Sequence, residues 1–182
     1  MDAVQIGWLV GAVVLALWVF GAYNRVVALR GAIVAAWQQV EESIQRRERL
    51  VAPLALRLRE GLPDGHGVLD AVVAGLAQCR ADVTTVNRRP LAHPDAIASL
   101  AAHEATLDEA LADMHRAIER NSTLREDAPL AAARAEIDAA VARVIATRQW
   151  FNDAATAYDS AIVQLPTRML MPLFGFRRVG RI

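Results

Sequence analysis

The sequence predicts an all-α protein in which a single transmembrane helix near the N-terminus continues into an antiparallel four-helix bundle. Two observations support this prediction. An uncharged apolar stretch lies at residues 6–23, and the rest of the chain repeats apolar residues at steps of three and four. Strand-like alternation is absent. We therefore divide the 182 residues into a transmembrane anchor at 1–23, a cytoplasmic bundle at 24–165 and a basic, apolar tail at 166–182.

The anchor is predicted from its length and its flanking residues. Counted from residue 4 to residue 23, it has about 20 residues, enough to cross roughly 30 Å of hydrocarbon. Trp8 near one end and Trp18 near the other suit the membrane interfaces. A cleaved signal peptide is the alternative, but Asp2 precedes the run and bulky residues fill most of its end. We expect residues 4–23 to lie in a lipid bilayer.

The orientation in the membrane follows from two arginines. Arg25 and Arg30 follow the apolar stretch, and no basic side chain precedes it. The positive-inside rule then places the N-terminus outside and everything after Tyr23 in the cytoplasm of a bacterial inner-membrane protein. Cys79, the only cysteine, is compatible with a reducing compartment.

The first helix is predicted to run without a break from the membrane into the bundle. No proline occurs between Met1 and Ala52, and the breaker-rich stretch EGLPDGHG follows at 60–67. A helix over residues 4–58 would be on the order of 80 Å long. The positions that repeat at steps of three and four, its seam, are Ile33, Trp37, Val40, Ile44, Arg47, Val51, Leu54 and Leu58.

Three more helices are predicted, separated by Pro- and Gly-containing or polar connections at 60–67, 88–94 and 121–129, and Pro94 suits a first helical position. The second seam is Leu69, Val72, Leu76, Cys79, Val83 and Val86. The third is Ile97, Leu100, Glu104, Leu107, Leu111, Met114 and Ile118. The fourth is Ile137, Val141, Val144, Arg148, Phe151, Ala155, Tyr158, Ile162 and Leu165. Four seams with short connections are typical of a four-helix bundle.

Three seam positions are charged instead of apolar: Arg47, Glu104 and Arg148. They lie on three different helices, so they can meet inside the bundle and fix its register, with Glu104 and Arg148 as neighbours. The alternative is that the arginine stems lie along the seam while their guanidinium groups extend to solvent.

Several function classes are disfavoured. A net charge of zero and a pI near 6.9 offer no basic stripe for nucleic acid. His103 and Glu104 begin like a zinc-protease motif, but Leu107 stands where the second ligand belongs. There is no phosphate-binding glycine loop and no nucleophile elbow. We therefore assign no catalytic residue, no metal ligand and no cofactor, and predict that the protein is not an enzyme.

Two blocks of the sequence resemble the LemA family. After the apolar stretch come a Tyr-Asn pair, a Trp, an Arg-Arg pair and a Leu, namely Tyr23, Asn24, Trp37, Arg46, Arg47 and Leu50. The C-terminal block follows the family's Arg, two Tyr-Asn pairs, Pro and closing Phe-Gly-Phe, namely Arg148, Phe151, Asn152, Tyr158, Asp159, Pro166, Phe174, Gly175 and Phe176. The resemblance covers nearly the whole chain.

The chain departs from the family pattern in both Tyr-Asn pairs of the C-terminal block. Phe151 replaces the first Tyr and Asp159 replaces the second Asn. If these residues form a recognition surface, the changes alter its specificity, whereas if they cap and pack, the changes are tolerable. The resemblance implies a membrane-anchored antiparallel helical bundle without an established enzymatic activity.

Three functions fit such a molecule. The first is a scaffold that docks an unidentified membrane or cytoplasmic protein at the cytoplasmic face of the membrane. The others are an accessory subunit of a membrane-bound zinc metalloprotease or envelope-stress system, and a membrane-remodelling protein. Gly7 and Gly11 form one GxxxG step through which two anchors could self-associate. The tail at 166–182 is expected near the membrane, either resting on anionic lipid or closing the membrane-proximal end of the bundle.

Overall fold

In the part of the chain that the structure describes, the regular secondary structure is helical. The computed structural model describes residues 2–62, 65–88, 94–164 and 178–182, and no strand occurs among them. The helices are α1 (Ala3–Gly61), α2 (His66–Arg88), α3 (Pro94–Arg120), the single turn α4 (Ser122–Arg125) and α5 (Ala128–Val163). The predicted all-α class is confirmed.

The first helix is longer than expected. α1 has 59 residues and includes Pro53, so at 1.5 Å per residue it is on the order of 90 Å long. It ends at Gly61, inside the breaker-rich stretch that was predicted to end it. α3 begins at Pro94, as expected. Proline has no backbone N–H, and the first position of a helix does not need one for a hydrogen bond within the helix.

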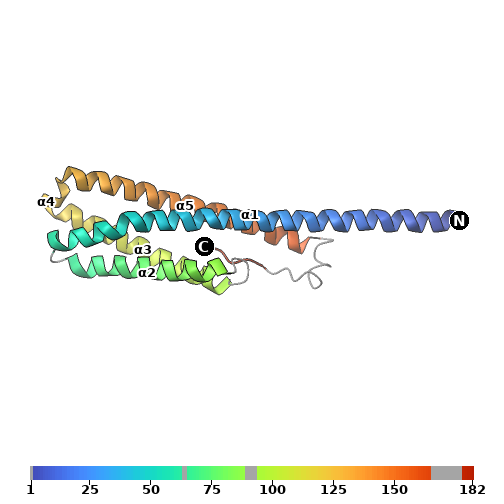
Figure 1. Ribbon diagram of the computed structural model, residues 1–182, viewed down its shortest axis with the longest axis horizontal. Helices are drawn as coiled ribbons and strands as arrows, with labels where there is room; N and C mark the ends of the chain where they lie inside the picture. Colours follow the sequence, from blue (N-terminus) through green and yellow to red (C-terminus); the bar gives the residue numbers. More distant parts are fainter. Residues whose placement is uncertain (1, 63–64, 89–93, 165–177) are drawn as a thin grey trace.

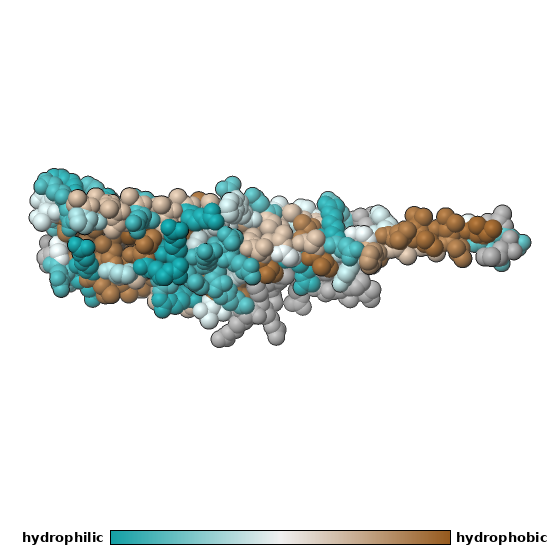
Figure 2. Space-filling view, turned by 45° about the horizontal axis from the view of Figure 1, so that its top comes forward, coloured by the Kyte–Doolittle hydropathy of each residue, from teal (hydrophilic) through white to brown (hydrophobic). Residues whose placement is uncertain are grey.

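The two halves of α1 differ sharply in burial. Along residues 5–25 nearly every side chain is exposed, including Trp8 at 78% and Leu17 at 67%, whereas Val26 is the first residue of the core at 1%. Figure 2 shows the apolar half as a narrow brown rod that extends beyond the packed part of the molecule. Among the described residues, α1 is the one helix long and apolar enough to cross a membrane.

The long helices lie lengthwise beside one another (Figure 1). α1 packs along α5, α2 packs along α3, and α1 also contacts α2. Followed by colour from the N-terminus, the chain runs down α1, back along α2, down α3 and back along α5. Gly75 allows the close approach of α2 to α3, because a Cβ atom there would lie 3.1 Å from Leu107 Cδ1.

The predicted seams of the first three helices form the core. Every one of those seam positions is buried, including the two charged ones, Arg47 and Glu104. On α5 the seam differs from the prediction, since Val141 and Arg148 are only partly buried. Ala140 and Thr147 are buried in addition to the expected Val144 and Phe151. At 3.6 residues per turn, Thr147 faces the core and Arg148 is turned about 100° towards its edge.

The stretch at 121–129 is more structured than a simple break. Asn121 caps α4 by accepting a hydrogen bond from the Leu124 N–H (3.2 Å), and Asp127 caps α5 by accepting one from the Leu130 N–H (3.2 Å). The Asn121 amide also donates to the carbonyl of Gly61 at the end of α1 (3.2 Å). The caps therefore fix how the chain enters α5 beside α1.

Candidate functional site

The charged seam residues meet in what we call the buried charged centre, formed by Arg47, Glu104, Asp108 and Arg148. Arg47 on α1 and Glu104 on α3 are both fully buried. The guanidinium donates from Nη1 to Glu104 Oε2 (2.9 Å) and from Nη2 to Glu104 Oε1 (2.6 Å). This forked geometry matches the planar guanidinium to the carboxylate and joins two helices that are far apart in sequence.

The expected pairing of Glu104 with Arg148 is not the one found. Arg148 is 22% exposed, and its Nη1 lies 3.9 Å from Asp108 Oδ2, while Arg47 Nη1 lies 3.8 Å from Asp108 Oδ1. Asp108 stands one helical turn after Glu104 on α3, so it lies between the two arginines. Because α5 is oriented with Thr147 facing the core, the Arg148 side chain points towards Asp108 and not towards Glu104.

Burial and charge act in opposite directions at this centre. Burial by itself would lower the pKa of the Arg47 guanidinium, but hydrogen bonding and the charge of Glu104 outweigh it, so the pKa is raised. Burial raises the pKa of the Asp108 carboxyl, although the charge of Arg47 opposes this. Burial, followed by the nearby charge of Glu104, also raises the pKa of the Cys79 thiol. A protonated, buried thiol is a poor nucleophile.

Arg47 Nε is buried and has no hydrogen-bond partner among the described residues. Arg47 and Glu104 otherwise engage each other, and Glu104 also faces the Cys79 thiol, whose raised pKa keeps it protonated. The arrangement can hold α1 and α3 in register, which is the best-attested use of buried polar groups.

A second polar layer lies around Trp37, on the side of this centre that faces the apolar half of α1. Trp37 is 2% exposed and donates from Nε1 to Asn87 Oδ1 (2.6 Å), and Asn87 donates to Glu41 Oε1 (2.6 Å). The Trp37 ring meets Phe151 of α5 edge-on, with ring centroids 5.9 Å apart. Phe151 is fully buried and makes an apolar contact, so the loss of a tyrosine hydroxyl at this position is accommodated by packing.

The last residues of the chain bind to α5 in what we call the tail clamp, formed by Asn152 and Asp159 with residues 179–182. Asn152 donates to the main-chain oxygen of Ile182 (2.7 Å) and accepts from the Ile182 N–H (3.0 Å). Asp159 accepts from the Val179 N–H (3.2 Å) and pairs with Arg181 Nη2 (2.9 Å). An Asn in place of Asp159 would lack the charge that pairs with Arg181.

The spacing of the tail clamp has a simple geometric reason. Residues 152 and 159 are seven apart, so they lie on one face of α5 about 10 Å apart. Residues 179 and 182 of an extended chain are also separated by about 10 Å. The two side chains therefore hold both ends of the segment 179–182. Val179 is 6% exposed, so its side chain packs against protein.

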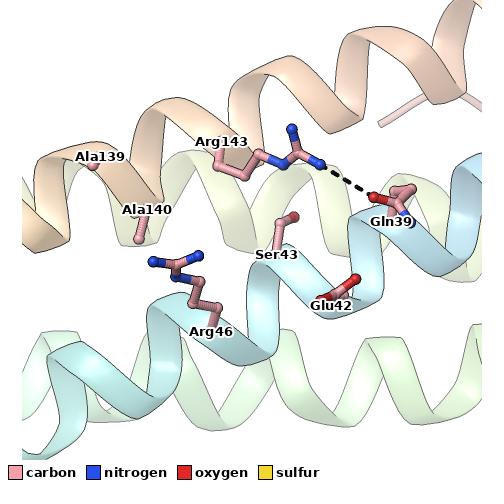
Figure 3. A pocket seen from close by; sticks show the side chains of 7 residues that line it. All are labelled: Gln39, Glu42, Ser43, Arg46, Ala139, Ala140 and Arg143. Carbon is pink, nitrogen blue, oxygen red and sulfur yellow. Dashed lines mark hydrogen bonds between the residues drawn. The ribbon is translucent and has the colours of Figure 1, made fainter.

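A polar groove runs between α1 and α5 on the surface, with a volume of about 360 Å³ (Figure 3). Arg46 reaches into it from α1 and Arg143 from α5, and Ala139 and Ala140 of α5 also line it. Arg143 donates to Gln39 Oε1 (3.2 Å). The remaining lining residues are Glu42 and Ser43, and we call this surface the α1/α5 groove.

The other positions that carry the family resemblance are spread along the molecule. Tyr23 and Asn24 are exposed on α1, Leu50 is partly buried against the core, and Tyr158 is buried on α5. The positions that lie outside the described residues are Pro166, Phe174, Gly175 and Phe176, together with Leu165 and the rest of the tail up to residue 177. Gly7 and Gly11 lie in the exposed apolar half of α1, where a Cβ would meet nothing within 4 Å.

No metal-binding group is found in the described part of the chain. Searched over those residues, no cluster of three or more His, Cys, Asp or Glu could hold an ion. His103 Nδ1 lies 2.6 Å from Asp82 Oδ2, and His115 lies beside Asp138 at 3.6 Å, so both histidines face a single carboxylate.

Sequence reasoning missed four features of these sites. Asp108 could have been found from its spacing of four residues after Glu104. The buried hydroxyl pair of Ser43 and Thr147 (2.8 Å), which joins α1 to α5, has no comparable signal. Neither do the hydrogen bond from Trp37 to Asn87 or the docking of residues 179–182, because these contacts join positions far apart in the chain.

A sequence model described as the LemA family matches residues 36–180, which covers most of the chain and includes Arg47, Glu104 and the tail clamp up to Gly180. A search among curated proteins finds no match to this sequence.

Proposed function

The chain belongs to the LemA family, and from that premise we propose that it is a membrane-anchored, non-enzymatic interaction scaffold. In this proposal the long helices form an antiparallel four-helix bundle that docks a partner protein at the cytoplasmic face of a bacterial inner membrane. The partner is a membrane or cytoplasmic protein.

The observation that carries the proposal is the continuity of α1. Its apolar half is exposed and could span a bilayer, and its second half contributes the core seam, with no linker between the two. A continuous helix transmits the position of the anchor directly to the packed helices. Such a construction suits a protein that holds a partner at a set distance from the membrane.

The orientation is supported by the charges that flank the apolar half. Arg25 and Arg30 follow it and are exposed, and no basic residue precedes it. By the positive-inside rule, the packed helices then lie in the cytoplasm.

The absence of an enzymatic role is supported by the state of the buried polar groups. Arg47 and Glu104 engage each other, and the raised pKa of Cys79 keeps its thiol protonated. All three side chains are buried in the packed interior. What the molecule offers to other molecules is its exposed helical surface.

Photo-cross-linking in living cells tests the scaffold directly. A benzophenone amino acid would replace Leu56 on α1, Val73 on α2 and Ile145 on α5, which are all exposed, with Leu9 in the apolar half as the lipid-facing control. We expect at least one of the first three positions to form a defined adduct with one protein, identified by mass spectrometry, and Leu9 to form none with it. The absence of an adduct at all three positions would contradict the scaffold.

The identity of the adduct separates the alternatives. A membrane-bound metalloprotease would favour the accessory-subunit function, and adducts of the chain with itself alone would favour membrane remodelling. The orientation is tested with Gly67→Cys in a Cys79→Ala background, since Gly67 is exposed and a side chain there meets nothing within 4 Å. Labelling of intact cells by a membrane-impermeant maleimide would contradict a cytoplasmic bundle.

A further inference from the structure

An exposed tryptophan stands beside the α1/α5 groove. Trp150 is 50% exposed although it lies on a helix that buries Phe151 next to it completely. The Arg143 guanidinium stacks over the Trp150 ring, with the guanidinium carbon 5.1 Å from the ring centroid. Arg143 is held at its other side by Gln39 of α1. The pair is therefore a fixed surface feature that is half open to solvent.

The second arginine of the groove is not engaged in an ion pair. Within the described residues, Arg46 forms neither a salt bridge nor a hydrogen bond from its side chain, and it points across the groove towards Ala140 (Figure 3). Arg143 likewise lacks a carboxylate partner in that part of the chain. Glu42 also lines the groove, so its three charged side chains sum to one positive charge.

Arginine and tryptophan side by side are typical of the energetically dominant residues at protein interfaces. The guanidinium group matches a carboxylate in two parallel hydrogen bonds, and the small residues Ala139 and Ala140 leave room for a second backbone to approach. Arg46 lies roughly 35 Å beyond Tyr23 along α1, too far for the headgroups of a membrane spanned by residues 4–23 to reach it. The occupant that fits is a protein segment.

We propose that the α1/α5 groove binds an acidic segment of a partner protein, whose carboxylates pair with Arg46 and Arg143 and whose apolar side chain packs on Trp150. This assignment rests on the proposed scaffold function, because it names the docking surface and the chemistry of the partner. Binding has two components, charge pairing that salt weakens and apolar contact that it does not.

Peptide binding tests the assignment with the full-length protein in detergent micelles. The probe is a short fluorescein-labelled helical peptide that carries glutamates and leucines on one face, followed by fluorescence anisotropy. We expect it to bind the native chain, with affinity that falls as salt is added. We expect a peptide with lysine in place of each glutamate not to bind.

The variants distinguish binding in the groove from a nonspecific attraction between the acidic peptide and surface arginines. Arg46→Ala with Arg143→Ala should weaken binding about tenfold, as expected for two partly exposed ion pairs, and Trp150→Ala should weaken it without changing the salt dependence. Arg49→Ala is the matched control, since Arg49 is also exposed on α1 and forms no ion pair in the described chain, but faces the side of Glu48 and Arg80. It should bind within twofold of the native chain, and circular dichroism should show unchanged helicity in all variants.

Three results of the peptide experiment would overturn the assignment. They are no binding of the acidic peptide by the native chain, equal losses in the Arg49 control and the double variant, and full displacement by inorganic phosphate at the peptide's concentration, which would indicate a small-anion site. In cells, an unchanged photo-adduct in the double variant would refute the groove and leave the scaffold standing. Loss of every adduct in the native chain would instead refute the scaffold.

Discussion

Arg46 and Arg47 are neighbours on α1, yet they lie in opposite surroundings. Arg47 is fully buried and gives both of its terminal nitrogens to Glu104, while Arg46 is exposed on the wall of the α1/α5 groove without an ion pair in the described chain. One residue of helix rotates a side chain by about 100°, enough to move it from core to surface. The arginine at position 47 therefore belongs to the packing of the helices, whereas the arginine at position 46 remains available to bind a partner.

The difference shows how burial sets the role of a charge. A guanidinium inside the protein must be paired, since an unpaired buried charge costs several kcal/mol, so Arg47 and Glu104 belong to the fold. A guanidinium at the surface is stabilised by water and contributes little to stability. Arg46 and Arg143 can therefore be removed at small cost, which makes them suitable for binding.

The largest effect is expected where the buried pair is broken. Glu104→Leu leaves the Arg47 guanidinium buried without its main partner, and we expect the free energy of unfolding to fall by about 3 kcal/mol or more. Arg46→Met, the matched change at the neighbouring position, should alter it by no more than about 0.5 kcal/mol. Urea unfolding of the full chain in detergent micelles, followed by circular dichroism, measures both.

A double-mutant cycle sharpens the same comparison. Arg47→Met combined with Glu104→Leu removes both charges, so its cost should be well below the sum of the two single changes. Additive losses would show that the residues are not coupled in the folded chain.

An intermediate effect is expected at the tail clamp, where polar side chains are partly buried. Asn152→Ala removes two hydrogen bonds to Ile182, and we expect a loss of about 1–2 kcal/mol in the stability of the docked tail. Limited digestion with a carboxypeptidase reports the docking, because a released C-terminus is cut faster. Asp153→Ala, at an exposed neighbouring position, is the control. Equal digestion rates in the native chain and the Asn152 variant would contradict the clamp.

The smallest effect is expected at Asp108, at the edge of the buried centre. Burial raises its pKa above the ordinary 3.8, so its contribution to stability is present below that pH and is lost as the pH rises through the folded-state pKa. At pH 7 the ionised Asp108 carboxylate slightly lowers the stability of the folded chain. Asp108→Asn should therefore leave stability unchanged or raise it by up to about 0.5 kcal/mol, given that the side chain is 38% exposed.

The pH dependence provides the check on Asp108. The stability of the Asn variant relative to the native chain should increase between pH 4 and pH 7, measured by urea unfolding at both values. A relative stability that decreases over this range would mean that the two arginines outweigh burial and that Asp108 belongs with Glu104 as a stabilising partner.

The sequence by itself determined the helices, the exposed apolar half of α1 and the core positions of α1, α2 and α3. The helices and core positions follow from a local periodicity, and the apolar half follows from an uncharged run, so neither requires a tertiary contact to be recognised. It also identified Arg47, Glu104 and Arg148 as charged residues at seam positions. Asn152 and Asp159 were identified as positions of the C-terminal motif through which the chain resembles the LemA family.

Only the tertiary structure decided which of these residues meet. Glu104 pairs with Arg47, 57 positions away, and Arg148 turns to Asp108 because Thr147 takes the inward position on α5. Asn152 binds the main-chain oxygen and the N–H of Ile182, 30 positions further along the chain. Such pairings depend on the rotation and axial shift of one helix against another. These are set by the packing of all the side chains between the helices together, so no local pattern in the sequence encodes them.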